Sequence, residues 1–403
     1  MSQPVENGVV LPLELCDRII DELAGDTRAL LACSSVSRSF YPRTRFLIFG
    51  TFRVNPVPQR NLGLLVDCWG QVPHIPAYIH TFHFSTVFLT EPQAASMLRY
   101  MRNVKTVFMN HVYIHHFRNR EAIEALAALP IETLTINGSD FTSINAFAFA
   151  MRCFPRLISL NLFGASISSA ADTEFPWVNN LDVCGPPRIE NLTVTARSVE
   201  TRKSNTRLFS EFPFNNQPFR IDNLNMFEVR CANQTDIVRI GRFLPHIPRT
   251  LRKLGITRVD NGVSTPGVPL PWVLGVHPLA LQSTEHLIID VGLRVGNYAD
   301  YLRWWISSIA AARDVRSISI RIAMAFTYLD KAENKPWQNV WQMIDSALSG
   351  KESLEQVVVE LQIPSCPRNF LGRKRGIESE CRDLIERGIM RVVLPKKVRL
   401  EAF

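Results

Sequence analysis

The sequence of 403 residues lacks any long uninterrupted apolar run, and its N-terminus lacks a basic segment followed by an apolar one. A membrane-spanning helix needs about 20 consecutive apolar residues, so the sequence predicts no span. A secretory signal needs a positively charged start and an apolar stretch, and neither is present in the opening Met-Ser-Gln-Pro-Val-Glu. We therefore expect a cytoplasmic or nuclear protein that does not enter a membrane.

Paired cysteines are also missing. The chain has eight cysteines, but no two form a C-x-x-C pair, and no cysteine and histidine spacing matches a zinc finger. Scattered cysteines in a chain of this length indicate free thiols in a reducing compartment. The sequence predicts neither a structural metal nor a cofactor.

Catalytic and nucleotide-binding motifs are absent too. The sequence contains no G-x-S-x-G, G-x-x-x-x-G-K-[ST] or G-x-G-x-x-G string. His111, His115 and His116 form an H-x-x-x-H-H group whose spacing can bind zinc on a helix. They follow a predicted strand, however, with no cysteine or acid nearby, so a solvated loop is the simpler interpretation. We expect a protein that is not an enzyme.

The net positive charge is compatible with an acidic partner but does not by itself indicate one. The chain carries a net charge of +8 but no dense lysine and arginine block, and its tightest basic runs, 373–375 and 396–399, are short. An evenly basic surface is therefore the simpler interpretation. Nucleic-acid binding stays open as an alternative that rests on the net charge alone.

The first fifty residues predict three short helices. Pro12 suits a first helical turn, where its missing N–H has no partner to lose. Gly25 ends this helix, and Asp26 can cap the next by accepting a bond from a free backbone N–H. A third helical segment spans residues 39–45, with Pro42 near its start because proline breaks a helix interior.

This segment resembles the F-box, a three-helix module that docks on the Skp adaptor of cullin–RING ubiquitin ligases. The resemblance rests on Leu-Pro-x-Glu-Leu-x-x-x-Ile-Ile-x-x-Leu, then Asp-x-x-x-Leu-Leu-x-x-Ser-x-Val-Ser-Arg-x-Phe. Two positions depart from the family pattern, which usually has Cys at Ser37 and Trp at Phe40. The resemblance implies that the adaptor-binding residues are Leu11, Pro12, Leu15, Ile19, Leu31, Val36, Arg38 and Phe40. The alternative is a plain helical cap on a larger domain.

The rest of the chain repeats the pattern φ-x-x-φ-x-φ, where φ is apolar, at steps of 25 to 39 residues. One position fails, Thr284. The final φ-x-φ alternates as a half-buried strand does. Between these strands, residues 121–129, 143–151, 298–312, 337–348 and 378–387 are predicted helices. The pattern starts at residues 49, 79, 104, 131, 157, 189, 221, 251, 284, 315, 354 and 389.

One strand and one helix per unit is the plan of leucine-rich repeats, in which stacked units share one core. The chain is therefore similar to F-box proteins with degenerate leucine-rich repeats, of the kind expanded in mushroom-forming fungi. The expected fold is α/β, with a tail over 1–10, an F-box-like helical domain over 11–48 and an irregular leucine-rich-repeat-like solenoid over 49–403. A parallel βαβ sheet of another kind stays open.

The resemblance implies the substrate-recognition subunit of a Skp–cullin–F-box ubiquitin ligase, with the repeats holding a target protein. A scaffold without ligase coupling is the alternative. In each φ-x-φ the middle residue points away from the core, which predicts a target-binding face. Its members include His83, Val358 and Val393 and, as the predicted target-binding residues, Phe108, Thr135, Asn161, Thr193, Asn225 and Ile288.

Overall fold

A computed structural model describes residues 11–54, 60–113, 116–167, 185–195, 218–231, 234–247, 250–258, 279, 281, 284–291, 298–323, 339–362 and 370–393. The packing divides the chain into two compact units, residues 1–134 and 135–403, with the boundary inside β4 (Thr133–Asn137). Both units combine helices with parallel strands, so the predicted α/β class is confirmed. The predicted tail 1–10 lies outside the described residues.

The first unit begins with the three predicted helices, α1 (Leu13–Glu22), α2 (Thr27–Val36) and α3 (Tyr41–Phe49). Asp26 caps α2 as expected, because its Oδ1 accepts the N–H groups of Arg28 and Ala29 at 3.1 and 3.0 Å. Pro42 lies in the first turn of α3, which runs four residues past the predicted end. Ile20 of α1 and Leu30 of α2 are buried, so each helix contributes a narrow apolar face to the module.

An ion pair ties α1 to α3. Arg43 donates from Nε and Nη2 to the two carboxylate oxygens of Asp21, at 2.6 and 2.7 Å. The two parallel bonds fix the planar guanidinium against the carboxylate. The hydrogen bond from Arg43 holds the pKa of Asp21 below its ordinary value of 3.8.

We expect this pair to make the packing of α1 sensitive to acid. A carboxyl group whose pKa is lower in the folded state stabilises the fold above its unfolded pKa and loses that contribution as the pH falls through its folded pKa. The wild-type chain should therefore be more stable than Asp21→Asn near neutral pH, and the difference should shrink below about pH 4. Urea unfolding of both chains, followed by circular dichroism across this range, measures it. A difference in stability between the two chains that does not change with pH would contradict the role assigned to the Asp21–Arg43 pair.

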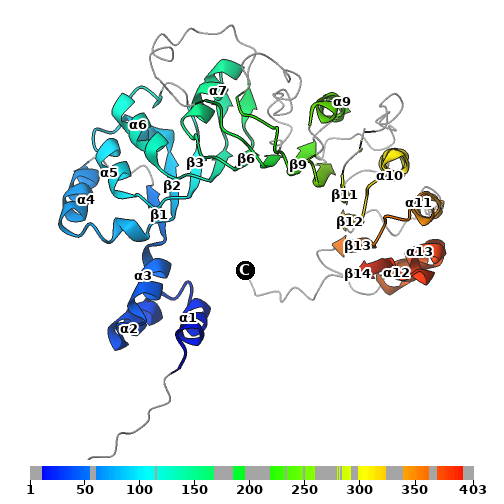
Figure 1. Cartoon of the computed structure of the whole chain (residues 1–403), viewed down its shortest axis with the longest axis horizontal. Helices are drawn as coiled ribbons and strands as arrows, with labels where there is room; N and C mark the ends of the chain where they lie inside the picture. The colour runs from blue at the N-terminus through cyan, green and yellow to red at the C-terminus, as the bar shows by residue number, and fades with distance from the viewer. Residues whose placement is uncertain are drawn as a thin grey trace, which may run out of the picture. The chain divides into compact units, whose positions relative to one another are not determined.

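The sheet of the first unit has β1 (Thr51–Val54), β2 (Thr81–Ser85) and β3 (Thr106–Asn110) in parallel register. Phe82, Phe84, Val107 and Met109 are buried at alternating positions of β2 and β3. Figure 1 shows helices along one side of these strands. The helical elements are α4 (Arg60–Gln71), η1 (Pro76–Tyr78), η2 (Thr86–Thr90), α5 (Ala94–Tyr100) and α6 (Arg120–Ala128).

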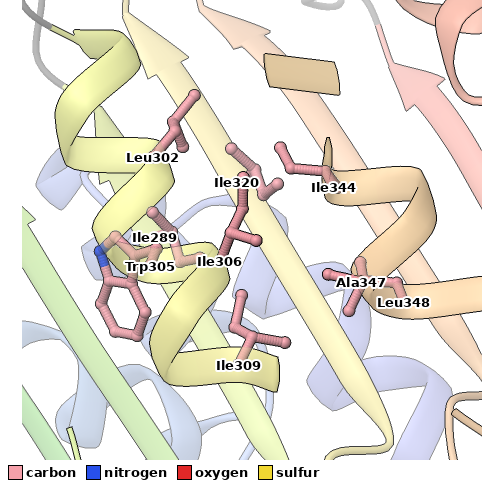
Figure 2. Close-up of a pocket in the computed structure, with 9 residues that line it drawn as sticks. All are labelled: Ile289, Leu302, Trp305, Ile306, Ile309, Ile320, Ile344, Ala347 and Leu348. Atoms are coloured by element: carbon pink, nitrogen blue, oxygen red, sulfur yellow. The ribbon is translucent and has the colours of Figure 1, made fainter. Parts of the chain in front are cut away.

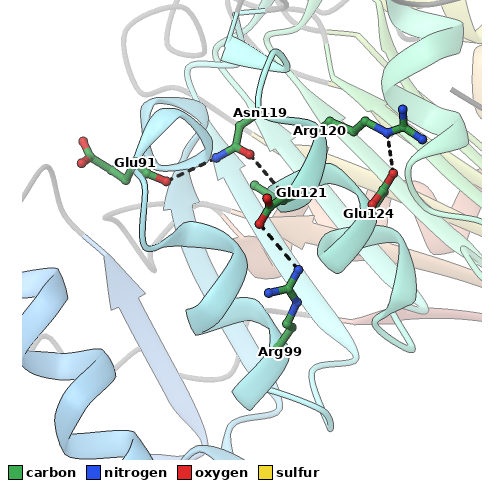
Figure 3. Close-up of polar contacts among 7 residues, drawn as sticks. Glu91, Arg99, Asn119, Arg120, Glu121 and Glu124 are labelled. Atoms are coloured by element: carbon green, nitrogen blue, oxygen red, sulfur yellow. Dashed lines mark hydrogen bonds and ion pairs between the residues drawn. The ribbon is translucent and has the colours of Figure 1, made fainter. Parts of the chain in front are cut away.

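Helix α6 begins at a capped turn that also contacts the preceding repeat (Figure 3). The Asn119 side chain accepts the N–H of Ala122 at 3.2 Å and donates to the carbonyl of Glu91 at 3.4 Å. Arg99 of α5 lies 3.8 Å from Glu121 of α6. Such exposed pairs add little stability, so the cap and the buried face of α6 position this helix.

The second unit contains a long parallel sheet, in the order β6-β8-β9-β10-β11-β12-β13-β14, that does not close on itself. Its helices α9, α10, α11 and α13 lie on one side of the strands (Figure 1). A two-strand ladder pairs β5 (Asp140–Phe141) with β7 (Ser166–Ile167). The strands are β6 (Ser159–Phe163), β8 (Asn191–Thr195), β9 (Met226–Cys231), β10 (Lys253–Arg258), β11 (His286–Val291), β12 (Ser317–Ala323), β13 (Gln356–Gln362) and β14 (Met390–Val393). The helical elements are α7 (Ile144–Arg152), α9 (Gln234–Phe243), η5 (Leu244–His246), α10 (Tyr298–Ala311), α11 (Val340–Ser349), α12 (Phe370–Glu380) and α13 (Arg382–Glu386).

The repeat pattern located the strands well. Ten of the 12 predicted windows lead into a strand two residues after their start, as the window at 157 leads into β6 at Ser159. In nine of these the fourth and sixth positions are buried, as Leu160 and Leu162 are. The exception is the window at 49, because Phe52 and Val54 are half-buried in β1. This first strand has a single partner, β2.

Two windows were placed out of register. The window at 221 has an overlapping match at 224, and β9 follows the second, since Phe227 and Val229 are buried and pair with Leu192 and Val194. The window at 389 is shifted by two residues, because Met390 and Val392 are the buried residues of β14.

The helices of the second unit leave little space against the sheet. Figure 2 shows α10 and α11 meeting over β11 and β12, where Trp305 and Ile344 pack against Ile289 and Ile320. The remaining void is about 10 Å³ and is lined by apolar side chains. A water needs about that volume together with polar partners, so this void is a packing gap and not a ligand site.

A buried carboxylate fixes the C-terminal helices. Asp345 of α11 accepts the N–H groups of Asp383 and Leu384 at 3.2 and 3.0 Å, which satisfies the first turn of α13. Cys381, which precedes α13, donates its thiol to the carbonyl of Trp341 at 3.4 Å. The cap of α13 therefore comes from a helix about forty residues earlier in the chain, which short-range sequence motifs cannot reveal.

Candidate functional site

Helix α1 turns two apolar side chains toward solvent. Leu15 and Ile19, one helical turn apart, are 44% and 57% exposed. Cys16 and Ile20, the next residue in each case, are buried. Leu11 and Leu13 before and at the start of the helix are exposed as well. The apolar residues of α1 thus form two faces, of which only one packs within the module.

Helix α2 repeats this arrangement. Leu30 is buried, whereas Leu31 is 48% exposed and Val36 is 74% exposed. We call the exposed apolar side chains of the two helices the outer helical surface. Its members are Leu11, Leu13, Leu15, Ile19, Leu31 and Val36.

The outer helical surface concentrates the exposed apolar residues of the protein. Six of the 12 large hydrophobic side chains that are exposed in the described part of the chain lie in it. Scattered exposed leucines are normal on soluble proteins, but this concentration within residues 11–36 points to an interaction site. Sequence reasoning had named all of these residues except Leu13, which occupies an unspecified position of the motif.

The remaining predicted adaptor-binding residues lie at the start of α1 and in the turn after α2. Pro12 is exposed and precedes α1, and Arg38 is exposed between α2 and α3. Phe40 is half-buried at the N-cap of α3. The Ser37 hydroxyl lies 2.8 Å from that of Ser39 and accepts the N–H of Ser39, so Ser37 shapes this turn.

The long parallel sheet of the second unit has one face that lies opposite its buried side chains. On this face, each strand contributes one residue to a single row. Strand pairing aligns Asn161 with Thr193, Thr193 with Glu228, and Glu228 with Gly255. The row is completed by Ile288, Ser319, Val358 and Arg391. We call these eight residues the strand row. Four of them, Asn161, Thr193, Glu228 and Ser319, are polar and half-buried, so this part of the face suits a partner that makes hydrogen bonds.

Ion pairs cross this face at two places. Lys253 lies 2.7 Å from Glu228, and Arg321 lies 3.4 Å from Glu360 on the neighbouring strand. Gly255 makes room for the first pair, because a Cβ there would come within 3.1 Å of the Glu228 side chain. These pairs order the charged side chains of the face.

Three of the six predicted target-binding residues lie in the strand row. Asn161, Thr193 and Ile288 belong to the strand row. Asn225 lies just before β9 and is exposed. Glu228 of β9 takes the position in the strand row that was predicted for Asn225. Thr135 is buried, and its hydroxyl accepts the Asn161 side-chain amide at 3.3 Å. The sequence signal for Glu228, Gly255 and Ser319 was present, since each is the middle residue of a φ-x-φ.

In the first unit, the corresponding face carries an aromatic stack. Phe108 and His83 lie on neighbouring strands with ring centroids 4.2 Å apart and planes 3° from parallel. Burial lowers the pKa of His83, and the nearby Arg53 lowers it further, so the imidazole is neutral near neutral pH. The stack covers one face of Phe108, which limits the apolar surface it exposes.

The structure describes His111 and His116 of the H-x-x-x-H-H group. Of the H-x-x-x-H-H group, His116 contacts the Thr86 hydroxyl at 3.0 Å, and His115 lies outside the described residues. Where the chain is described, no cluster of histidine, cysteine and acidic residues could hold a metal. Burial raises the pKa of the Cys153 thiol to about 12, which makes it a poor nucleophile.

A comparison with protein-family profiles and with curated proteins finds no match for this chain. Among the helices described, none is long and apolar enough to cross a bilayer. The site must therefore be interpreted from its own geometry.

Proposed function

We propose that this protein is a substrate-recognition subunit of a Skp–cullin–F-box ubiquitin ligase. The observation that carries the proposal is the outer helical surface. Three short helices with a small core expose six large apolar side chains on α1 and α2, and five of these are positions that dock the adaptor in the F-box pattern. An adaptor that covers them would remove apolar surface from water, which is the main driving force of association.

In this role the chain holds a target and catalyses nothing. The outer helical surface would bind the adaptor, and the strand row would bind the target. Tethering raises the effective concentration of the target's lysines near the conjugating enzyme. The open parallel sheet of the second unit supports this proposal, because its strands present side chains along one face, as the strands of leucine-rich repeats do.

Isolation of native complexes tests the proposal. The tagged full-length chain is purified under mild conditions from the cells that make it, and the bound proteins are identified by mass spectrometry. A ligase subunit should bring peptides of a Skp-type adaptor and a cullin. A scaffold without ligase coupling would bring other partners and neither of these two, and that result would reject the proposal.

The target should bind the open strand faces. Phe108→Asp and Ile288→Asp, tested separately, place a carboxylate on the face of the first and second unit. An unpaired charge in an interface costs several kcal/mol, so the affinity for a target that binds the changed face should fall about a hundredfold or more. The measurement is the amount of each target captured, relative to wild type. Ile158→Asp is the matched control, because Ile158 is exposed but precedes β6. Capture retained by both variants, with intact circular dichroism, would contradict the assignment of target binding to the strand faces.

A further inference from the structure

One serine lies on the exposed side of α2 that also carries Leu31 and Val36. The residues Arg28, Leu31, Ala32, Ser35 and Val36 are all exposed. Their spacing of i, i+3, i+4, i+7 and i+8 places them on one side of the helix. Ser35 is the one hydroxyl among these five residues, and it is flanked by Leu31 one turn before and Val36 next to it.

The neighbouring serines differ from Ser35 in position. Ser34 and Ser37 are half-buried, and Ser39 lies beyond the end of α2. The Ser35 hydroxyl donates to the carbonyl of Ala32 at 2.7 Å, a local bond that leaves the oxygen exposed to solvent. The Ser35 side chain is therefore open to solvent on the outer side of α2.

We infer that Ser35 is a phosphorylation site that switches adaptor docking off. The inference rests on the proposed function, since the outer helical surface must bind an adaptor for the switch to act. In the reaction, the Ser35 oxygen attacks the γ-phosphorus of a nucleoside triphosphate bound to a protein kinase. The bond to the bridging oxygen breaks, the nucleoside diphosphate leaves, and the hydroxyl proton passes to a base of the kinase.

The added group opposes docking in two ways. It places up to two negative charges between Leu31 and Val36, where the proposed interface is apolar and water is excluded. It also lies in the last turns of α2, where the helix dipole disfavours an anion. Arg38 follows three residues later, and a phosphate that attracts its guanidinium would withdraw a second predicted contact from the adaptor.

The experiment compares full-length chains that differ at position 35 in their affinity for a purified Skp-type adaptor. One chain carries phosphoserine at position 35, introduced during translation, and others carry Ser35→Asp and Ser35→Asn. The control is Ser346→Asp, because Ser346 is an exposed serine in the last turns of α11, a helix of the same length. Circular dichroism shows that each chain is folded.

We expect phosphoserine to weaken adaptor binding about a hundredfold and Ser35→Asp at least about tenfold. Ser35→Asn and Ser346→Asp should bind within about twofold of wild type. Equal affinity of the phosphorylated and wild-type chains would overturn the switch and leave the proposed function intact. A wild-type chain that does not bind the adaptor would overturn both.

A second arm asks whether the site is used. The chain is isolated from the cells that make it, in an adaptor-bound and an adaptor-free fraction, and phosphate at Ser35 is measured in each by mass spectrometry. Phosphate confined to the adaptor-free fraction is the expected result. Ser35 without phosphate in both fractions, or with equal phosphate in both, would overturn the inference.

Discussion

The double change Pro12→Ala with Leu15→Arg is expected to abolish co-purification of the adaptor while target capture persists. Leu15 is 44% exposed on α1, so arginine there costs the fold little. In the complex, the guanidinium would be desolvated against an apolar partner without a counter-charge. Such a charge costs several kcal/mol, which corresponds to a loss of about a hundredfold or more in affinity. In cells, the level of the target should rise.

The matched control is Leu64→Arg. Leu64 is 70% exposed on α4 in the same unit, but outside the outer helical surface. This variant should bind adaptor and target as the wild type does. If the double change removes both activities together, the helical module and the repeats are not separable. If it removes neither, Leu15 does not contact the adaptor.

Leu160→Ala and Leu192→Ala are each expected to destabilise the chain by about 2–5 kcal/mol. Both side chains are fully buried, and they are paired across β6 and β8. Truncation removes apolar contacts and leaves a cavity that the close-packed sheet and helices cannot fill. Urea unfolding followed by circular dichroism gives the change in midpoint for each single variant.

The control for this pair is Thr193→Ala, one residue from Leu192 but on the strand row. Because its side chain is half-exposed, the change should alter stability by about 0.5 kcal/mol or less. A strand shifted by one residue would reverse the two results, since each side chain would move to the other face. Neutral effects of both leucine changes would therefore reject the register.

The strands of this protein were predictable because each repeats one short apolar pattern. A parallel strand with a helix on one face buries the two apolar residues of its φ-x-φ. Leu160 and Leu162 are such a pair in β6, and Leu287 and Ile289 are one in β11. Where two matches overlap, as around Leu224, local sequence cannot choose the register. Packing decides it, because Phe227 aligns with Leu192 on one side and Leu254 on the other.

The candidate site was predictable in part. The pattern of residues 11–40 named five of the six residues of the outer helical surface, but helical spacing alone places Leu15, Ile19 and Ile20, at i, i+4 and i+5, on one apolar face. In the structure Ile20 is buried and Leu15 and Ile19 are exposed, because α1 contacts α3 along one narrow side only. Helical periodicity shows which residues are neighbours, and it does not show how wide a face the next helix covers.

A titration of the purified full-length chain with a purified Skp-type adaptor tests the central claim most directly. Isothermal calorimetry at several temperatures measures the affinity and the heat-capacity change. Burial of the outer helical surface predicts a dissociation constant of about 1 μM or tighter and a negative heat-capacity change. The Val36→Arg chain, changed at a side chain that is 74% exposed, should bind at least about tenfold more weakly. No binding by the wild-type chain, or equal binding by both chains, would contradict the account.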